Sequence, residues 1–240
     1  MRFAVISDVH GNALALDAVL ADIAAHGVDA TLCLGDSVSG PVDPAGALER
    51  IMGLSGPFVA GNHDRWVGGQ ARADMWSADS YAIANLSPDQ LAWVAALPKT
   101  AVFADTVFLC HGTPLDDEAA WLDNFYDGRT TTLPDEADVS RLADGLNYPV
   151  LLCGHTHIAR SVRLRDGRLI VNPGSVGMQL LRGTPDAHYA IVERRAGQWS
   201  TSLRAVPYDY EAAARQAAAN GFPQWAESIR HGWAGPESLD

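Results

Sequence analysis

Five short segments of the sequence place a residue that can bind a metal ion directly after an apolar run. They are ISDVHGN at 6–12, LGDSVSG at 34–40, AGNHD at 60–64, LCHG at 109–112 and CGHTH at 153–157. Five of the eight histidines lie in these segments, which an even scatter along the chain would rarely produce. Imidazole mixed with carboxylate groups suits Zn, Mn, Fe or Ni better than Mg or Ca, which prefer oxygen ligands. The pattern therefore predicts a site for transition-metal ions.

The candidate ligands are too numerous for a single tetrahedral ion. They are Asp8, His10, Asp36, Asn62, His111, His155 and His157. Two pairs among them have i, i+2 spacing, which in an extended chain points both side chains to the same face. Seven ligands suit two ions that share one bridging carboxylate. This predicts a two-metal hydrolytic centre.

The elements that must position these residues alternate between strand and helix over the first 64 positions. Residues 2–7 read as a buried strand, and 13–27 has the apolar spacing of a helix that Asn12 caps and Gly27 ends. A second strand at 30–36 and a second helix at 44–54 follow, and then a short strand with a loop at 56–64. Such alternation predicts a parallel sheet, and side chains at the carboxyl ends of its strands converge on one crevice.

The remainder of the chain begins with a helical stretch at about 66–97, in which Ser87 caps a helix. Short strands then dominate, with turns at Asp166-Gly167 and Ala196-Gly197. Two helices broken at Asn220-Gly221 end the chain. We expect one domain over 1–240, with C-terminal helices in 208–240 packed on it, and a turn-rich segment at 113–145 that could cover a site.

The charge and composition narrow the class of partner. The net charge is −12, and duplex nucleic acid is disfavoured because binding its phosphates takes a basic face. A small phosphorylated substrate remains compatible, because a bound divalent cation inverts the local field. No run of 18 apolar residues exists to span a bilayer, and the chain starts at once with a strand rather than a signal peptide. We therefore expect a cytoplasmic protein, and the sequence leaves its oligomeric state open.

The five segments contain, in this order, DVH, GDSVSG, GNHD, CHG and GHTH. In this the chain resembles the calcineurin-like metallophosphoesterases, and in size and in segments such as VNPGSVG it resembles their small bacterial and archaeal branch. The resemblance implies an α/β fold, a four-layer α/β/β/α sandwich of two mixed sheets flanked by helices. It also implies two ligand sets that share Asp36 as the bridge. One set is Asp8, His10, Asp36 and His157, and the other is Asp36, Asn62, His111 and His155.

The activity that the resemblance implies is metal-dependent hydrolysis of phosphate esters. Two divalent ions, of Mn, Fe, Zn or Ni, would share a hydroxide that attacks the phosphoryl group in line. His63 lies next to the ligand Asn62, and in the family this histidine faces the substrate, so we assign it general-acid protonation of the leaving oxygen. Asn12, at a helix start beside His10, could donate a hydrogen bond to a phosphate oxygen.

One departure of the sequence from the family pattern narrows the class of substrate. The serine/threonine phosphoprotein-phosphatase branch reads GDxxDRG, with an aspartate that orients the acid histidine and an arginine that binds phosphate, whereas this chain has Ser39 and Gly40. Protein substrates are therefore disfavoured, while phosphodiesters, nucleotides and small phosphomonoesters stay open. Two further alternatives are a scaffold protein that keeps the fold without turnover, and a nuclease, against which the acidic charge and short length count.

Overall fold

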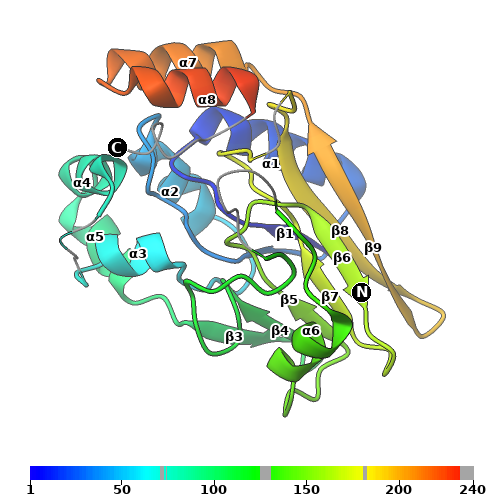
Figure 1. Ribbon diagram of the computed structural model, residues 1–240. Helices are drawn as coiled ribbons and strands as arrows, with labels where there is room; N and C mark the ends of the chain where they lie inside the picture. The colour runs from blue at the N-terminus through cyan, green and yellow to red at the C-terminus, as the bar shows by residue number, and fades with distance from the viewer. Residues whose placement is uncertain (71–72, 74, 125–130, 181–182, 233–240) are drawn as a thin grey trace.

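Two β-sheets pack face to face, and helices cover the outer side of each (Figure 1). The computed structural model describes residues 1–70, 73, 75–124, 131–180 and 183–232. Its elements in chain order are β1 (Arg2–Ile6), α1 (Ala13–His26), β2 (Ala30–Cys33), α2 (Pro44–Met52), α3 (Asn62–Val67), α4 (Ser77–Asn85), α5 (Pro88–Ala95), β3 (Thr100–Phe103), β4 (Val107–Cys110), α6 (Glu136–Leu142), β5 (Val150–Leu152), β6 (Arg160–Arg163), β7 (Leu169–Asn172), β8 (Ala187–Arg195), β9 (Gln198–Val206), α7 (Tyr210–Ala219) and α8 (Pro223–His231). The predicted α/β sandwich of two mixed sheets is confirmed.

The first sheet has the strand order β2-β1-β8-β9. The parallel pairing expected from the strand–helix alternation holds for β1 and β2, with Phe3 opposite Ala30. The sheet is nevertheless mixed, because the long β8–β9 hairpin returns from the end of the chain and lies antiparallel to β1. The strand expected at 56–64 is reduced to one parallel bridge between Cys33 and Phe58.

The second sheet has the strand order β3-β4-β5-β7-β6. Strands β4, β5 and β7 are parallel at its centre, and β3 and β6 pair antiparallel at its two edges. The predicted turn at Asp166-Gly167 joins β6 to β7, and that at Ala196-Gly197 joins β8 to β9. Both residues of the second turn have positive φ, 48° at Ala196 and 82° at Gly197, which matches the twist of a tight hairpin.

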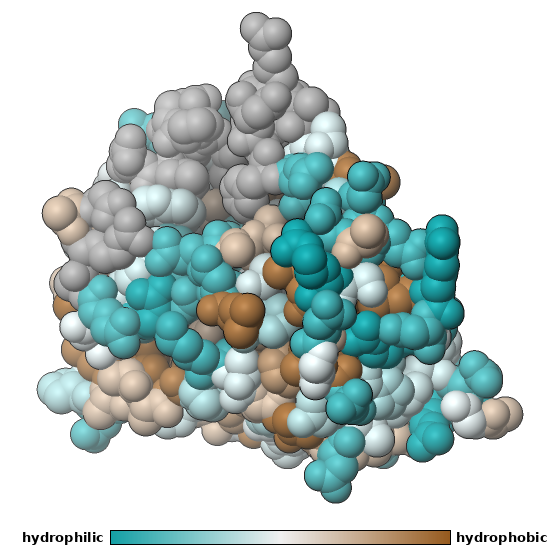
Figure 2. Space-filling view, turned by 60° about the horizontal axis from the view of Figure 1, so that its bottom comes forward, coloured by the Kyte–Doolittle hydropathy of each residue, from teal (hydrophilic) through white to brown (hydrophobic). Residues whose placement is uncertain are grey.

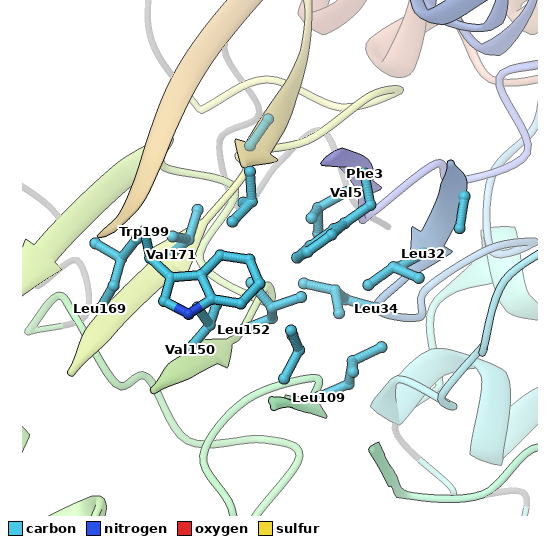
Figure 3. Packing of buried hydrophobic residues seen from close by; sticks show 14 of the residues in the cluster. Phe3, Val5, Leu32, Leu34, Leu109, Val150, Leu152, Leu169, Val171 and Trp199 are labelled. Atoms are coloured by element: carbon cyan, nitrogen blue, oxygen red, sulfur yellow. The ribbon is translucent and has the colours of Figure 1, made fainter. Parts of the chain in front are cut away.

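The core between the sheets consists of alternate side chains from their facing strands (Figure 3). Phe3 and Val5 of β1 face Leu109, Leu152 and Val171 of the second sheet. All five are completely buried, and each such side chain contributes about 1.5–3 kcal/mol through its removal from water. This packing holds the two sheets together at the level of the strands from which the candidate ligands emerge.

Helices form the outer layers on both sheets. Helices α1 and α2 cover the first sheet through a cluster that includes Leu16, Val19 and Ile51, and α6 covers the second through Val139. Asn12 caps α1 by accepting from Ala15 N–H at 3.1 Å, and Gly27 ends the helix with φ 58°, both as predicted.

The helical stretch expected at 66–97 is three helices, α3, α4 and α5, and the last begins at the predicted cap Ser87. The C-terminal helices α7 and α8 pack against each other and α7 lies along α1 (Figure 1). Residues 233–240 of the expected C-terminal segment lie outside the described residues.

The surface is mixed in character. On the face in Figure 2, polar side chains predominate, and apolar ones stand singly or in small groups among them. Such scattered apolar groups are ordinary for a globular protein. Among the residues that the structure describes, no helix has the length and apolar character needed to cross a membrane.

Candidate metal centre

Six of the seven candidate ligands lie just beyond the carboxyl ends of four strands, two in each sheet, and the seventh, Asn62, is the first residue of α3. Asp8 and His10 follow β1, and Asp36 follows β2 in the first sheet. His111 follows β4, and the pair His155 and His157 follows β5 in the second sheet. Because the sheets pack face to face, their parallel strand ends bring these side chains to one place between the sheets.

The backbone at these residues differs from the extended geometry that the i, i+2 spacing suggested. Asp8 and His10 have φ of 54° and 47°, and His155 and His157 have φ of 68° and 59°, all in the left-handed region. The extended-strand reasoning was wrong because β1 ends at Ile6 and β5 at Leu152, before the ligands begin. The side chains converge through left-handed turns instead. Asp36, with φ 51°, shares this conformation.

Two groups of three side chains are close enough to hold a metal ion each. The first is Asp8, His10 and His157, and the second is Asp36, His111 and His155; within each group the ligand atoms lie within 4.8 Å of one another. Asp8 Oδ1 lies 3.3 Å from His157 Nε2 and 3.9 Å from His111 Nε2, so the carboxylate of Asp8 adjoins both groups. Asp36 Oδ2 lies 3.1 Å from His111 Nε2.

Three of the imidazole rings are oriented by backbone carbonyl groups. The Nδ1 atoms of His10, His111 and His157 lie 2.6 Å, 2.8 Å and 2.6 Å from the carbonyl oxygens of Ser39, Leu34 and Met178. A carbonyl only accepts a hydrogen bond, so each Nδ1 carries a proton, and Nε2 of the neutral ring has a lone pair. This is how proteins commonly orient histidines that bind a metal through Nε2.

The tautomers fixed in this way favour the binding of a cation in the first group. The Nε2 atoms of His10 and His157 lie only 3.2 Å apart, and with both Nδ1 atoms protonated two lone pairs face each other. Among the described residues, Asn62 Oδ1 is also buried without a hydrogen-bond partner. Buried polar atoms left in this state are costly unless another partner binds them. The residues therefore fit a pair of metal ions.

The charge states of four of these side chains agree with this fit, whereas His111 differs because burial lowers its pKa but Asp36 outweighs this effect and raises the pKa to about 10. Burial raises the pKa of Asp8, but His157 and His111 outweigh it and bring the pKa to about 2. Burial also raises the pKa of Asp36, and His111 and His63 hold it well below its usual range. Burial, reinforced by neighbouring histidines, lowers the pKa of His10 and of His155 to about 4 each. At neutral pH the site thus offers two carboxylates and at least two neutral imidazoles, the forms that bind metal.

A family model, the calcineurin-like phosphoesterase superfamily domain, matches residues 1–197. The chain belongs to this superfamily. The uncharacterised protein MJ0912 of Methanocaldococcus jannaschii is 30% identical over 246 aligned residues, which cover 92% of this chain and 94% of that protein.

Two solved structures share the fold over almost the entire chain. A metallophosphoesterase from Sphaerobacter thermophilus is 25% identical, with a TM-score of 0.77, and the match covers 97% of this chain and 99% of that one. The hypothetical protein PH1004 from Pyrococcus horikoshii OT3 has a TM-score of 0.80 at 16% identity, with 97% and 98% covered. The resemblance predicted from the five motifs is confirmed.

The phosphoesterase motif GNHD forms the start of α3 and touches the Asp36 loop. The backbone N–H of His63 donates to Asp36 Oδ1 at 2.9 Å, next to the unpartnered Asn62 Oδ1. The Asp64 carboxylate accepts from the backbone N–H groups of Ser37 at 2.9 Å and Gly61 at 3.2 Å. Asp64 therefore ties the second and third motifs together. Burial and the charge of Asp36 raise its pKa to about 7.

The environment of His63 contains an aspartate that sequence reasoning missed. Asp79, in the first turn of α4, lies with Oδ1 2.8 Å from His63 Nδ1 and is completely buried. Burial lowers the pKa of His63, but Asp36 and the hydrogen bond to Asp79 raise it above its usual value. Three residues after Trp76, Asp79 has the spacing of an ordinary helix-cap residue, so no local signal marks its contact with His63.

The side-chain contacts of Asn12 favour the helix-cap role over the predicted substrate contact. Its Oδ1 accepts from Ala15 N–H, and its Nδ2 lies 3.2 Å from the Gly177 carbonyl oxygen and 3.1 Å from Tyr208 Oη. Both amide protons therefore have partners within the protein, and the side chain is fully buried. Contact between Asn12 and a phosphate stays a prediction that would require these bonds to break.

The described part of the segment at 113–145 is fastened to two motif loops; residues 125–130 lie outside the described residues. Arg65 of α3 pairs with Asp117 at 2.7 Å. Asp123 accepts from the hydroxyl of Thr156, in the GHTH motif, at 3.1 Å and pairs with Arg160 at 2.6 Å. Residues 113–124 thus brace the loops that carry His63 and His157, and the prediction that the segment covers a site stays untested.

Proposed function

We propose that this protein is a two-metal-dependent phosphoesterase that hydrolyses phosphodiester or small phosphomonoester bonds, including those of nucleotides. The observation that carries the proposal is the paired arrangement of His10 and His157, whose Nε2 atoms lie 3.2 Å apart while both Nδ1 atoms contact carbonyl oxygens. A metal cation bound by the two lone pairs would make this arrangement favourable. Membership of the phosphoesterase superfamily supports the reaction class.

The proposed ligands form two sets. Asp8, His10 and His157 would hold one ion, and Asp36, Asn62, His111 and His155 the other, with a shared carboxylate between them; Asp36 is our proposed bridge, and Asp8 also adjoins both groups. Their mixed nitrogen and oxygen atoms suit Mn, Fe, Zn or Ni. When bound, the ions would supply Lewis-acid polarisation of the phosphoryl oxygens and a water nucleophile of lowered pKa.

The protein's own side chains set the charge of the site. Asp8 and Asp36 contribute two negative charges, which is less than two divalent ions bring, so the loaded site is positive and attracts a phosphate. This local field is required because the chain as a whole carries −12 and would otherwise repel the substrate. The acidic surface also keeps duplex nucleic acid a disfavoured substrate.

His63 is the proposed general acid. Its ring lies 5.6 Å from that of His10, beside the proposed ligands, and although burial lowers its pKa, Asp36 and Asp79 raise it above the usual value, which favours the protonated ring. As the bond from phosphorus to the leaving oxygen breaks, the proton on Nε2 would pass to that oxygen, a contribution of about 10²- to 10⁴-fold in rate. The leaving group thus departs as a neutral alcohol.

The backbone near His10 supports small substrates over phosphoproteins. The arginine of the protein-phosphatase pattern would stand at Gly40, where a Cβ would lie 1.8 Å from the carbonyl oxygen of His10. No side chain fits there without moving a ligand loop. The phosphate-binding arginine of that branch therefore has no equivalent at this position.

Metal analysis combined with hydrolysis assays tests the proposal. Purified protein should bind about two equivalents of Mn, Fe, Zn or Ni, and should hydrolyse at least one of bis-p-nitrophenyl phosphate, p-nitrophenyl phosphate or a nucleotide panel. Asp36→Asn should lose metal and activity together, whereas Asp29→Asn, at the start of β2 and remote from the ligands, should lose neither. Full metal loading without any turnover would instead support a scaffold of the same fold.

A further inference from the structure

Asp79 contacts the proposed acid from outside all five motifs. Its side chain is completely buried, and each carboxylate oxygen has one N–H donor among the described residues. Oδ1 lies 2.8 Å from His63 Nδ1, and Oδ2 accepts from the backbone N–H of Trp76 at 2.9 Å. A single carboxylate therefore links the start of α4 to the imidazole presented by α3.

The hydrogen bond decides which nitrogen of His63 can exchange a proton. An ionised carboxylate only accepts, so Nδ1 of His63 carries its proton in both charge states of the ring. The proton that the His63 ring gains or loses is consequently the one on Nε2. Without Asp79 the neutral ring would be free to adopt the opposite tautomer, with the proton on Nε2. In that tautomer Nε2 has no lone pair, so the protonated acid cannot be restored by proton uptake at Nε2.

Ser39 does not provide this orientation, although it stands where the phosphoprotein phosphatases have their aspartate. Its carbonyl oxygen accepts a hydrogen bond from His10 Nδ1–H at 2.6 Å, and its buried hydroxyl has no hydrogen-bond partner among the described residues. Within the part of the chain that the structure describes, Asp79 is the carboxylate that pairs with the His63 ring at hydrogen-bond distance.

Two indole rings hold the imidazole in place. The centroid of the His63 ring lies 4.2 Å from that of Trp76 and 4.6 Å from that of Trp66. Trp76 is itself tied to Asp79 through its backbone N–H, so the same carboxylate fixes the imidazole and one of the rings packed on it. His63 is 3% exposed, and these contacts limit the number of orientations available to it.

We propose that Asp79 is a positioning residue that keeps a proton on His63 Nδ1, so that the protonated ring gives its Nε2 proton to the leaving oxygen and is left as the Nδ1–H tautomer, and that the natural substrate is a phosphate ester of an aliphatic alcohol. The inference rests on the proposed function and adds the class of leaving group. An alkoxide is a poor leaving group that departs only with a proton, whereas a nitrophenolate departs without one. An acid held in a fixed position therefore accelerates the hydrolysis of phosphate esters of sugars or other aliphatic alcohols.

The proton and bond changes balance within this arrangement. The N–H bond at Nε2 breaks as the O–H bond of the departing alcohol forms and the P–O bond to that oxygen breaks. His63 is left neutral, with Nδ1–H still donating to Asp79. Asp79 takes no proton and touches neither substrate nor product.

The Asp79→Asn variant tests the inference with the p-nitrophenyl and methyl esters of one nucleotide, which share the phosphoryl group and differ in leaving group. An amide has one acceptor oxygen and cannot receive both N–H groups, so it disrupts the tautomer or the helix cap. We expect kcat to fall about 100-fold on the methyl ester and less than about fivefold on the p-nitrophenyl ester. KM and metal content should be unchanged.

Two measurements separate positioning from simple structural support. In a His63→Ala background, Asp79→Asn should have no further effect on methyl-ester hydrolysis, because its role acts through the imidazole. Equal losses on both esters, or a further loss in that background, would overturn the inference. Asp43→Asn is the matched control, since Asp43 caps α2 through Gly46 N–H at 2.9 Å and should leave the ratio of the two esters unaltered.

A spectroscopic readout covers the case in which Asp79→Asn does not fold. Long-range ¹H–¹⁵N correlation spectra of wild-type protein, chelated and then zinc-loaded, should show neutral His63 protonated on Nδ1. The opposite tautomer would refute the assignment to Asp79. Wild-type protein inactive on both esters would overturn the proposed function and the leaving-group class, while the tautomer measurement would still decide the positioning role.

Discussion

Gly154 allows the CGHTH loop to lie directly against the strand end that carries Asp8. A Cβ at position 154 would lie 2.1 Å from Ser7 Oγ, 3.1 Å from Ser7 Cβ and 2.9 Å from Asp8 Oδ2. Ordinary contact between such atoms is about 3.5–4.0 Å, so Gly154→Ala must push the loop away from β1. The adjacent His155 N–H donates to Asp8 Oδ2 at 3.2 Å, and this bond lengthens with the same movement.

The size of the effect follows from overpacking of a buried site. Gly154→Ala should lower the free energy of unfolding by about 1–3 kcal/mol, measured by urea denaturation in chelator so that metal binding does not mask it. Within the described part of the chain the Ser7 hydroxyl is buried without a hydrogen-bond partner, so Ser7→Ala alone should be nearly neutral. Because it removes the atom in closest conflict, Ser7→Ala should restore at least about 1 kcal/mol when combined with Gly154→Ala.

Zinc affinity provides the second readout. Gly154→Ala should weaken zinc binding in both ligand groups, since the loop carries His155 of one and His157 of the other. Gly53→Ala is the control, because a Cβ there is 3.4 Å from its nearest neighbour, the Arg50 carbonyl oxygen. The reasoning fails if Gly154→Ala is as stable as Gly53→Ala, or if Ser7→Ala gives no rescue.

Three further outcomes are expected. His63→Ala should keep both metals yet lose about 10²- to 10⁴-fold in turnover on an alkyl ester; undiminished turnover there would contradict its role as acid. His111→Ala and His157→Ala should each lose one ion preferentially, because the two residues belong to different groups, and elemental analysis showing equal loss of both ions would contradict the grouping. Asp22→Asn, which removes the carboxylate bound by Arg204 and Tyr189, should cost about 1 kcal/mol of stability without affecting activity. Arg204 lowers the pKa of Asp22, so its contribution should be present above the unfolded pKa and fade as pH falls in urea titrations of wild type against Asp22→Asn.

The convergence of the candidate ligands could be predicted from sequence because each follows an apolar run that the core requires. Val5 and Leu152 are fully buried, so the strand ends that precede Asp8 and His155 are set by hydrophobic packing. The caps at Asn12 and Ser87 were likewise predictable, since a cap bonds to residues three positions away.

Features that depend on contacts between distant segments could not be predicted from the sequence. Asp79 meets His63 only because α3 and α4 pack together, and within its own helix it has the pattern of a common cap residue. The mixed character of the first sheet arises from a hairpin at 187–206, far along the chain from β1. The left-handed turns escaped prediction because the spacing of Asp8 and His10 gives no sign of where β1 ends.

The left-handed backbone conformation at the candidate ligands lowers the stability of the fold while it brings together the side chains proposed to bind metal. Outside glycine, the conformation costs about 1–2 kcal/mol per residue, and Asp8, His10, Asp36, His155 and His157 all adopt it. Glycine occupies it without that cost, so Asp8→Gly or His157→Gly should give a more stable metal-free protein than the corresponding alanine variant. For crystals of an inactive protein with an intact substrate, glycine is accordingly the better replacement for a ligand. A lineage that lost its metals would be expected to accumulate glycine at these same five positions.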